Sequence, residues 1–185
     1  QTNRTWWLQV RRLENRFRIL LYDARGQGQS DLRQSNLTLD GHVKDLHELL
    51  DYLGVNRAHL VGLSHGARVA CRFGAVIPER TDRILLCGLG KDLDSRTAAM
   101  LNSWIHILNS GSFEAMIWSM LPIVYGKFFL EQYKSTLNDI VSAIVKRNQA
   151  DAVKAHVQAM IRYLPVTDSI PEAYPTTLII VTGDQ

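Results

Sequence analysis

Residues 59–70 read HLVGLSHGARVA, and this stretch decides the fold. The apolar positions up to Val61 predict a short buried strand, and the small and apolar residues after Gly66 predict a helix. Between them lies the pattern G-x-S-x-G, which begins at Gly62. A turn that lifts a serine hydroxyl above a sheet strains the backbone of that serine, and its neighbours must be small because strand and helix approach closely. In this strand–turn–helix context the pattern is typical of a nucleophilic serine, here Ser64.

The residue after this serine has a second expected role. Ser64 would lie at the N-terminus of the following helix, where the backbone N–H of His65 points at the place in which an oxyanion forms. The helix dipole favours negative charge there. A pattern with three fixed positions also occurs by chance, so the assignment depends on the strand before it and the helix after it. We predict Ser64 as the catalytic nucleophile and the His65 N–H as an oxyanion donor.

The composition is that of an ordinary globular protein with one domain. The chain has 185 residues, of which 46% are hydrophobic and 21% charged, and its net charge is +3. No aromatic interleaving and no basic block follows the densest group of basic residues, so this group indicates a solvated face and not a contact with nucleic acid. This group comprises Arg4, Arg11, Arg12, Arg16 and Arg18.

Compartment and redox state follow from what the sequence contains. No run of 18 apolar residues occurs, so we expect no membrane span. No signal peptide is visible, and we therefore expect a cytoplasmic protein. Cys71 and Cys87 lie among apolar residues, which favours buried free thiols over a disulfide or a metal pair.

Hydrophobic periodicity predicts alternating strands and helices in the first half of the chain. A helix is expected over residues 1–16 and an amphipathic helix over residues 38–53, with Thr38 as its N-cap and Gly54 as its terminator. The expected strands are residues 17–22, 58–62, 83–87 and 177–182. Because these strands are apolar throughout, they predict one parallel sheet that is covered on both faces.

The second half of the chain is predicted to be helical. Residues 93–165 show helical spacing of apolar residues and no strand signal. Breaks near residues 110–111, Pro122 and residues 149–150 predict three or four helices. We expect this region to lie over the carboxyl ends of the strands, near Ser64.

Taken together, these motifs resemble the α/β-hydrolase fold family, and specifically its capped esterase-like and lactonase-like hydrolases. Residues 22–30, YDARGQGQS, look like the family's D-x-R-G-x-G-x-S loop after the fourth strand. Residues 49–66 look like its third helix, fifth strand and nucleophile elbow. Residues 78–80 and 175–183 look like the entries to its sixth and seventh strands. The joint order of these motifs is specific, although each alone is not, and it covers nearly the whole chain.

The resemblance implies an α/β fold with a mostly parallel sheet and a helical cap insertion. It divides the chain into the first part of the hydrolase core (residues 1–92), the cap (residues 93–168) and a return to the core with the seventh strand (residues 169–185). In the family, three strands and a histidine–glycine loop precede the equivalent of Gln1, and an eighth strand and the catalytic histidine follow the equivalent of Gln185. The resemblance thus implies an internal fragment, with the first strands and the last strand missing and the triad incomplete.

A serine needs a base, which in such sites is a histidine oriented by a carboxylate. None of the first three histidines suits this role. His42 and His47 are expected to be solvated or to cap a helix, and His59 lies at the wrong end of its strand.

The remaining histidines are also weak candidates. The ring of His65 is a candidate for lining a pocket, while its backbone is the useful part. His106 and His156 lie in the helical insertion, where we expect surface positions, with a pocket-lining role as the alternative.

The candidates for the acid are aspartates. Asp184 is near the place that the family uses but two residues early. Asp92 and Asp94 follow the sixth strand, a position that some members of the fold use. Asp23 belongs to the glycine-bearing loop, where we expect its carboxylate to accept hydrogen bonds from backbone N–H groups of residues 26–30.

These observations predict a serine-nucleophile hydrolase of an ester, thioester or lactone with an apolar acyl part, acting through an acyl-enzyme. Alternatives are a carbon–carbon bond hydrolase or acyl transferase on the same triad, and a non-catalytic ligand-binding relative. Serine at the elbow argues against halide-displacing and epoxide-opening relatives, which the resemblance associates with aspartate. We expect a small-molecule apolar acyl substrate, no metal because ligand spacing is absent, and no cofactor because Gly26-x-Gly28 lacks the rest of a dinucleotide fingerprint.

Overall fold

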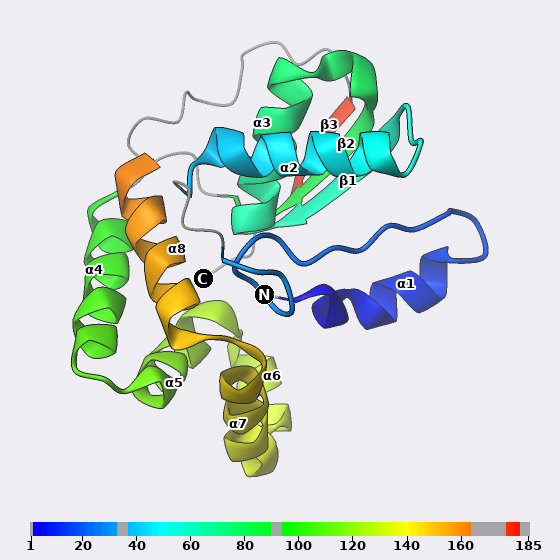
Figure 1. Ribbon diagram of the computed structural model, residues 1–185. Helices are drawn as coiled ribbons and strands as arrows, with labels where there is room; N and C mark the ends of the chain where they lie inside the picture. The colour runs from blue at the N-terminus through cyan, green and yellow to red at the C-terminus, as the bar shows by residue number, and fades with distance from the viewer. Residues whose placement is uncertain (1, 33–36, 90–93, 164–176, 182–185) are drawn as a thin grey trace. The chain divides into compact units, whose positions relative to one another are not determined.

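The computed structural model describes residues 2–32, 37–89, 94–163 and 177–181 (Figure 1). The chain forms two compact units. The helical unit comprises residues 1–35 and 97–158, and the sheet unit comprises residues 36–96 and 159–185.

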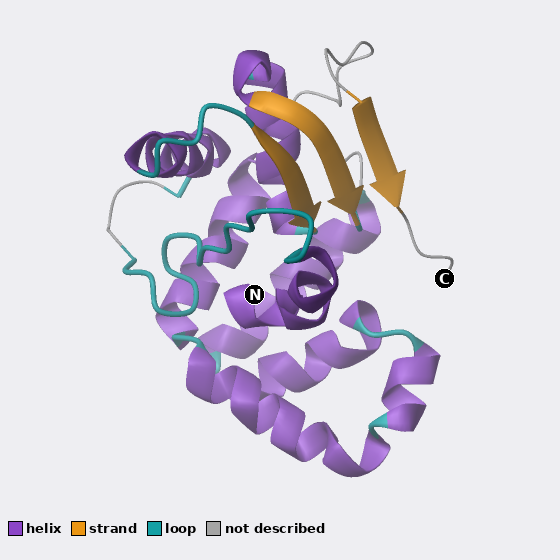
Figure 2. Ribbon diagram, turned by 90° about the vertical axis from the view of Figure 1, so that its right-hand side faces the viewer, coloured by secondary structure: helices purple, strands orange, loops and turns teal. Residues whose placement is uncertain are grey.

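The sheet unit contains three parallel strands. β1 (Ala58–Leu63), β2 (Thr81–Cys87) and β3 (Thr177–Val181) pair in the order β1-β2-β3. Figure 2 shows their three arrows running in one direction. The parallel pairing predicted for these three segments is confirmed.

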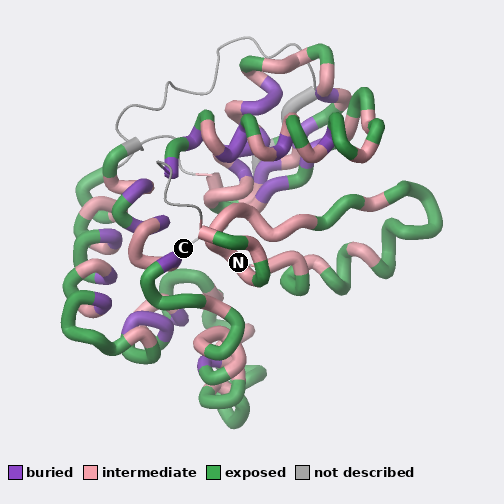
Figure 3. The backbone as a smooth tube through the Cα atoms, viewed as in Figure 1, coloured by how far each residue is buried: buried purple, intermediate pink, exposed green. Residues whose placement is uncertain are grey.

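Two helices cover one face of this sheet. α3 (His65–Val76) packs on β1 and β2, and α2 (Leu39–Tyr52) packs on α3 (Figure 1). Figure 3 shows buried positions along both helices. Side chains with at most 2% exposure form the centre of this core, among them Leu50, Phe73, Ile84 and Leu86. Each contributes about 1.5–3 kcal/mol relative to an exposed side chain, so burial on this face dominates the stability of the sheet unit.

The opposite face of the sheet is more open. The register places Val61, Leu85 and Ile179 in one row across the three strands. Val61 is 49% exposed and Ile179 is 55% exposed. Within the sheet unit α2 and α3 lie together on one face, and cover of the other face stays a prediction.

The ends of α2 follow the predicted capping chemistry. Thr38 Oγ1 accepts a hydrogen bond from the Gly41 N–H at 3.0 Å, which satisfies one of the unpaired donors of the first turn. At the other end Gly54 adopts φ +65°, a left-handed conformation that glycine adopts without a steric penalty. Both predicted termini of this helix are confirmed.

Arg80 fastens the segment that leads into β1. It ends the 3₁₀ helix η2 (Pro78–Arg80), just before β2. Its guanidinium donates to Asp51 Oδ1 at 2.7 Å, to the Val55 carbonyl at 2.8 Å and to the Asn56 carbonyl at 2.6 Å. One side chain thus links the end of α2, the loop into β1 and the start of β2.

The helical unit begins with a 3₁₀ helix, η1 (Asn3–Trp6), and with α1 (Trp7–Leu13). Residues 18–24 continue as a loop, so the strand predicted at residues 17–22 is wrong. A strand needs a neighbouring strand for its backbone ladder, and the described sheet consists of β1, β2 and β3 alone. Its apolar side chains remain exposed, at 48% for Phe17 and 40% for Leu20.

The rest of this unit is helical, as the periodicity predicts. The helices are α4 (Ser95–Asn109), α5 (Phe113–Val124), α6 (Lys127–Gln132), the 3₁₀ helix η3 (Lys134–Thr136), α7 (Leu137–Arg147) and α8 (Ala150–Tyr163). Breaks occur where predicted near residues 110–111 and 149–150. Leu101, Met116 and Val141 are fully buried, and α5 packs on α7. None of these described helices combines the length and apolar character needed to cross a membrane.

The break predicted at Pro122 is wrong, because this proline lies inside α5. Proline has no backbone N–H to donate, and α5 ends two residues after it, at Val124. The N–H of Tyr125 donates to the carbonyl of Leu121 at 2.9 Å, which closes the last turn. Because proline has no backbone N–H, the last turns of α5 lack the hydrogen bond that residue 122 would donate to the carbonyl of Trp118.

Candidate active site

Ser64 is the single residue between the end of β1 and the start of α3. Its backbone angles are φ 53° and ψ −114°. Among the described residues it is the only one other than glycine with a positive φ. Such a conformation costs on the order of 1–3 kcal/mol and persists only where the surrounding structure imposes it. The predicted strand-to-helix turn with unusual backbone angles is confirmed, and the catalytic role of Ser64 stays a prediction.

Backbone hydrogen bonds hold this serine from both sides. The Ser64 N–H donates to the Cys87 carbonyl at 2.8 Å, which extends the β1–β2 ladder by one residue. The Ser64 carbonyl accepts from the N–H groups of Ala67 at 3.0 Å and Arg68 at 3.2 Å, which begins α3. The hydroxyl does not cap the helix, and the residue is exposed. Within the described chain, the hydroxyl is therefore available for a substrate.

The two glycines of the turn differ in what surrounds them. A Cβ atom on Gly62 would lie 2.5 Å from the carbonyl carbon of Gly66 and 2.6 Å from the Cα of Ala67. A Cβ atom on Gly66 would meet no described atom within 4 Å. The close approach of strand and helix is thus made at Gly62, against the backbone of Gly66.

His65 is the first residue of α3, so its N–H lies in the turn whose donors lack acceptors within the helix. This position also has the positive end of the helix dipole. The His65 ring makes an edge contact with the ring of His42, with 4.7 Å between ring centroids and 76° between planes. The His65 ring therefore packs against α2, while its backbone N–H lies in the first turn of α3.

The expectation that His42 is solvated or caps a helix is wrong. His42 is only 2% exposed, and it lies on the buried side of α2 with Leu39, Val43 and Leu46. Its spacing of three from Leu39 and four from Leu46 places it on this stripe. The polar character of histidine conceals this position in the sequence, although the imidazole ring is apolar enough to pack in a core and the helical spacing of His42 matches that of its apolar neighbours.

The next histidines of the sheet unit have structural surroundings. His47 Nε2 lies 2.9 Å from Arg80 Nη1, and His47 Nδ1 lies 3.7 Å from an Asp51 carboxylate oxygen. His59 is exposed near the start of β1, away from the end that carries Ser64. Neither histidine is placed to take a proton from Ser64.

The helical unit contains the other two histidines. His106 is exposed on α4, as expected. His156 is buried instead, and its Nε2 lies 2.8 Å from the Arg25 carbonyl oxygen, so this nitrogen carries the hydrogen. Burial lowers the pKa of His156 below its ordinary value, and the hydrogen bond to Arg25 partly opposes this shift. The surface position expected for His156 is wrong, because the ring fastens α8 to the glycine-bearing loop.

Asp23 has the structural role that the sequence predicts. Its carboxylate accepts hydrogen bonds from the Gln29 N–H at 3.2 Å and from the Asn3 N–H at 2.6 Å. The Ser30 hydroxyl donates to the Asp23 carbonyl at 2.6 Å. This residue organises the loop and ties it to η1.

The other candidate acids give no support for a catalytic pair. Asp94 is described and exposed. Asp92 and Asp184 lie outside the described residues. Within the described residues Cys71 and Cys87 form no disulfide, and both are half-buried and not buried as predicted.

The strained serine elbow on a parallel sheet matches a known family. Residues 4–110 match the family model of the α/β hydrolase fold. The chain belongs to this family.

Curated relatives extend beyond the matched regions. RutD from Caulobacter sp. (strain K31), whose name gives it provisionally as a carbamate hydrolase, is 25% identical over 164 residues, which are 85% of this chain and 60% of that protein. The 3-oxoadipate enol-lactonase 1 of Acinetobacter baylyi is 39% identical over 69 residues, which are 37% of this chain and 26% of that enzyme. The chain therefore spans 60% or less of each of these relatives.

Solved structures show the same fold. An enol-lactonase from Burkholderia xenovorans LB400 matches 98% of this chain with a TM-score of 0.83 and 23% identity, over 68% of its own length. A thermophilic esterase from Thermogutta terrifontis matches 98% of this chain with a TM-score of 0.82 and 22% identity, over 66% of its own length. At these identities the likeness establishes the fold alone.

Proposed function

We propose that Ser64 is the nucleophile of a hydrolase that acts on an ester, thioester or lactone with an apolar acyl part. The observation that carries this proposal is the exposed hydroxyl at a strained strand-to-helix turn. A protein retains on the order of 1–3 kcal/mol of backbone strain where function needs it. A role in folding alone would not need this conformation, because a glycine would adopt it without a Cβ penalty.

The proposed reaction has two halves. Ser64 Oγ attacks the carbonyl carbon while a base takes the hydroxyl proton, and the His65 N–H donates to the oxyanion that forms. The tetrahedral intermediate expels the alcohol or thiol, which receives the proton, and an acyl-enzyme remains. Water then adds to the acyl carbon, its proton passes to the base, and the free acid leaves as the Ser64 hydroxyl recovers its proton.

The names of the similar proteins support this reaction class. An enol-lactonase and an esterase both transfer an acyl group from oxygen to water. A lactone would leave its alcohol attached to the acid, whereas an ester would release it, and the same elbow serves both. We therefore include lactones and esters in one proposed substrate class.

A second candidate function is hydrolysis of a carbon–carbon bond. A hydrolase of 2-hydroxy-6-oxononadienedioate from Paraburkholderia phymatum is 36% identical over 93 residues, which are 50% of this chain and 32% of that enzyme. The compound in that name is a keto acid without an ester group, so its hydrolysis must break a bond to the ketone carbon. The same serine and oxyanion donor would serve that reaction.

Hydrolysis of a short-chain nitrophenyl ester tests the role of Ser64. The assay uses the full natural protein that contains these residues, with Ser64→Ala and with Ser103→Ala as the matched control. Ser103 lies on an exposed side of α4, where its hydroxyl donates to the Met100 carbonyl. We expect Ser64→Ala to lose on the order of a thousandfold or more in kcat, and Ser103→Ala to keep the wild-type rate.

Two further readouts separate the alternatives. An adduct of an alkyl phosphonate on the peptide that contains Ser64, seen by mass spectrometry, supports a covalent nucleophile. The 185-residue chain alone is expected to be nearly inert, because no described contact joins the Ser64 hydroxyl to a histidine ring. Full activity of Ser64→Ala would refute the role of Ser64 as nucleophile, whereas no hydrolysis by the wild-type protein would favour a ligand-binding role. Strong turnover by the 185-residue chain that depends on Ser64 would show that one of its own histidines is the base.

A further inference from the structure

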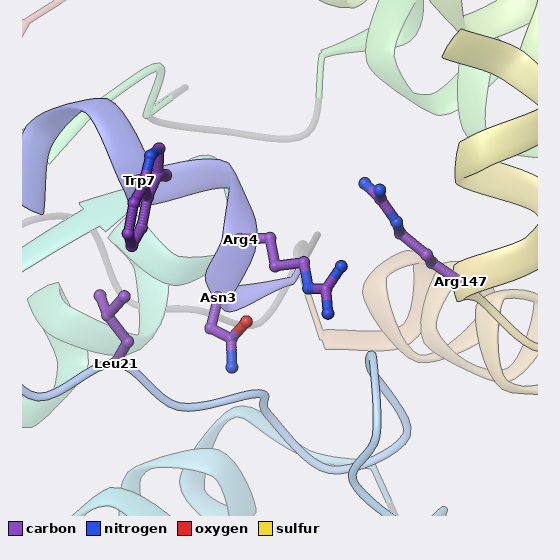
Figure 4. Close-up of a pocket in the computed structure, with 5 residues that line it drawn as sticks. All are labelled: Asn3, Arg4, Trp7, Leu21 and Arg147. Carbon is purple, nitrogen blue, oxygen red and sulfur yellow. The ribbon is translucent and has the colours of Figure 1, made fainter. Parts of the chain in front are cut away.

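The helical unit contains a pocket of about 610 Å³ that is distinct in composition from the serine elbow. Its lining comes from η1, α1, the loop after α1 and the last residue of α7, and consists of Asn3, Arg4, Trp7, Leu21 and Arg147. Figure 4 shows the side chains of Arg4 and Arg147 extending toward each other. The pocket lining therefore includes two arginines from segments that are far apart in the sequence.

The charges of this pocket are unbalanced. Neither Arg4 nor Arg147 forms an ion pair or a hydrogen bond through its side chain with a described residue, and the described residues that line the pocket include no acidic one. The carboxylate of Asp23 accepts a hydrogen bond from the backbone N–H of Asn3. Guanidinium groups stay protonated at every physiological pH. Two such groups that face one pocket repel each other, and an anion bound between them would remove that repulsion.

The remaining wall is apolar and accessible. Trp7 is 61% exposed and Leu21 is 38% exposed. Arg11 lies over the Trp7 ring, with its guanidinium carbon 6.0 Å from the ring centroid, and adds positive charge near that ring. An indole offers a rigid surface for a flat ligand.

From this combination we propose that the pocket binds an organic carboxylate with a flat apolar body. The planar fork of arginine matches the two oxygens of a carboxylate, and the Asn3 amide can donate a further hydrogen bond. The volume lies in the range of about 300–1,000 Å³ that is usual for small-molecule sites. This proposal concerns the helical unit alone and does not depend on the role of Ser64.

Binding of benzoate to the 185-residue chain tests the proposal, by isothermal titration calorimetry and by tryptophan fluorescence. Benzamide has the same ring without the charge, and inorganic phosphate has charge without the ring. We expect saturable benzoate binding, with each control compound at least about tenfold weaker because each lacks one half of the recognition. Equal binding of benzamide would show that the arginines do not recognise the carboxylate. Equal binding of phosphate would show that the apolar wall does not contribute to binding. Either result overturns the proposal.

Matched variants locate the site. Arg4→Gln and Arg147→Gln should each weaken benzoate binding about tenfold or more. Arg147→Lys should also bind benzoate more weakly than wild type, because lysine keeps the charge but lacks the planar fork. The controls are Arg12→Gln on α1 and Lys146→Gln on α7, which remove the same charge outside the pocket. All of these side chains are exposed, so circular dichroism should show unchanged folding. Equal losses in the control variants would show a general charge effect and refute the site.

Discussion

The strand and the helix of the elbow leave no room for a Cβ atom at Gly62, and Gly62→Ala tests the consequence of this close packing. The added Cβ would lie 2.5 Å from the Gly66 carbonyl carbon and 2.6 Å from the Ala67 Cα, and nearer still to the Gly66 oxygen. These are backbone atoms of α3, so no side-chain rotation can relieve the contacts. Either β1 or the first turn of α3 must move.

The cost can be worked from what such a movement disturbs. Overpacking a well-packed site costs about 1–3 kcal/mol, and we expect the upper end of this range because α3 has buried Ala67 and Phe73 next to the sheet. Gly66→Ala is the matched control, since its Cβ would meet no described atom within 4 Å. It replaces glycine by alanine within a helix, which stabilises by about 0.5–1 kcal/mol. The two neighbouring substitutions should therefore act in opposite directions.

Urea unfolding followed by far-ultraviolet circular dichroism measures both effects. We expect the free energy of unfolding to fall by about 3 kcal/mol for Gly62→Ala and to stay level or rise slightly for Gly66→Ala. A variant of Gly62 that does not fold at all agrees with the same reasoning. Wild-type stability of Gly62→Ala, or an equal loss for Gly66→Ala, would refute the asymmetry of the turn.

Two further predictions concern strain and titration. Ser64→Gly should unfold at higher urea than Ser64→Ala, because relief of about 1–3 kcal/mol of strain exceeds the about 0.5–1 kcal/mol that glycine costs in chain entropy; equal midpoints would contradict the strain. Burial keeps the pKa of His156 in the folded chain below its ordinary value of 6.5, so the unfolded chain is protonated at this residue first as the pH falls. The stability that neutral His156 contributes above pH 6.5 is therefore lost as the pH falls through the lowered folded pKa. The thermal midpoint measured from pH 7.5 to pH 5 should fall less in His156→Gln than in wild type, with exposed His106→Gln as the control, and equal slopes in all three proteins would count against this explanation.

The parts of the structure that sequence predicted well are those set by local chemistry. The elbow follows from a fixed pattern between a strand and a helix, and Thr38 and Gly54 define the ends of α2 through capping rules. Each of these depends on a few neighbouring residues, whose preferences the sequence displays directly. The three parallel strands follow because continuous apolar segments alternate with helices.

The predictions that failed depend on partners distant in the chain. Residues 17–22 have the composition of a strand, but a strand exists only where another strand completes its ladder. The burial of His42 and His156 is likewise set by elements that pack on them, and the residue type does not reveal it. Arg80 could not be ranked above other arginines, because its acceptors at Asp51, Val55 and Asn56 gather only after folding.

The strain at Ser64 remains because the elements on both sides of it are fixed by larger energies. Its cost is about 1–3 kcal/mol, while Phe73, buried on α3, and Ile84, buried on β2, each contribute about 1.5–3 kcal/mol. Shifting the serine to relaxed angles would break its hydrogen bond to the Cys87 carbonyl or change the direction in which α3 leaves the sheet. Either change would uncover several such side chains. The burial energy of the sheet and α3 thus exceeds the strain energy at Ser64 and keeps its hydroxyl in place. A nucleophile that is positioned before the substrate binds requires this condition.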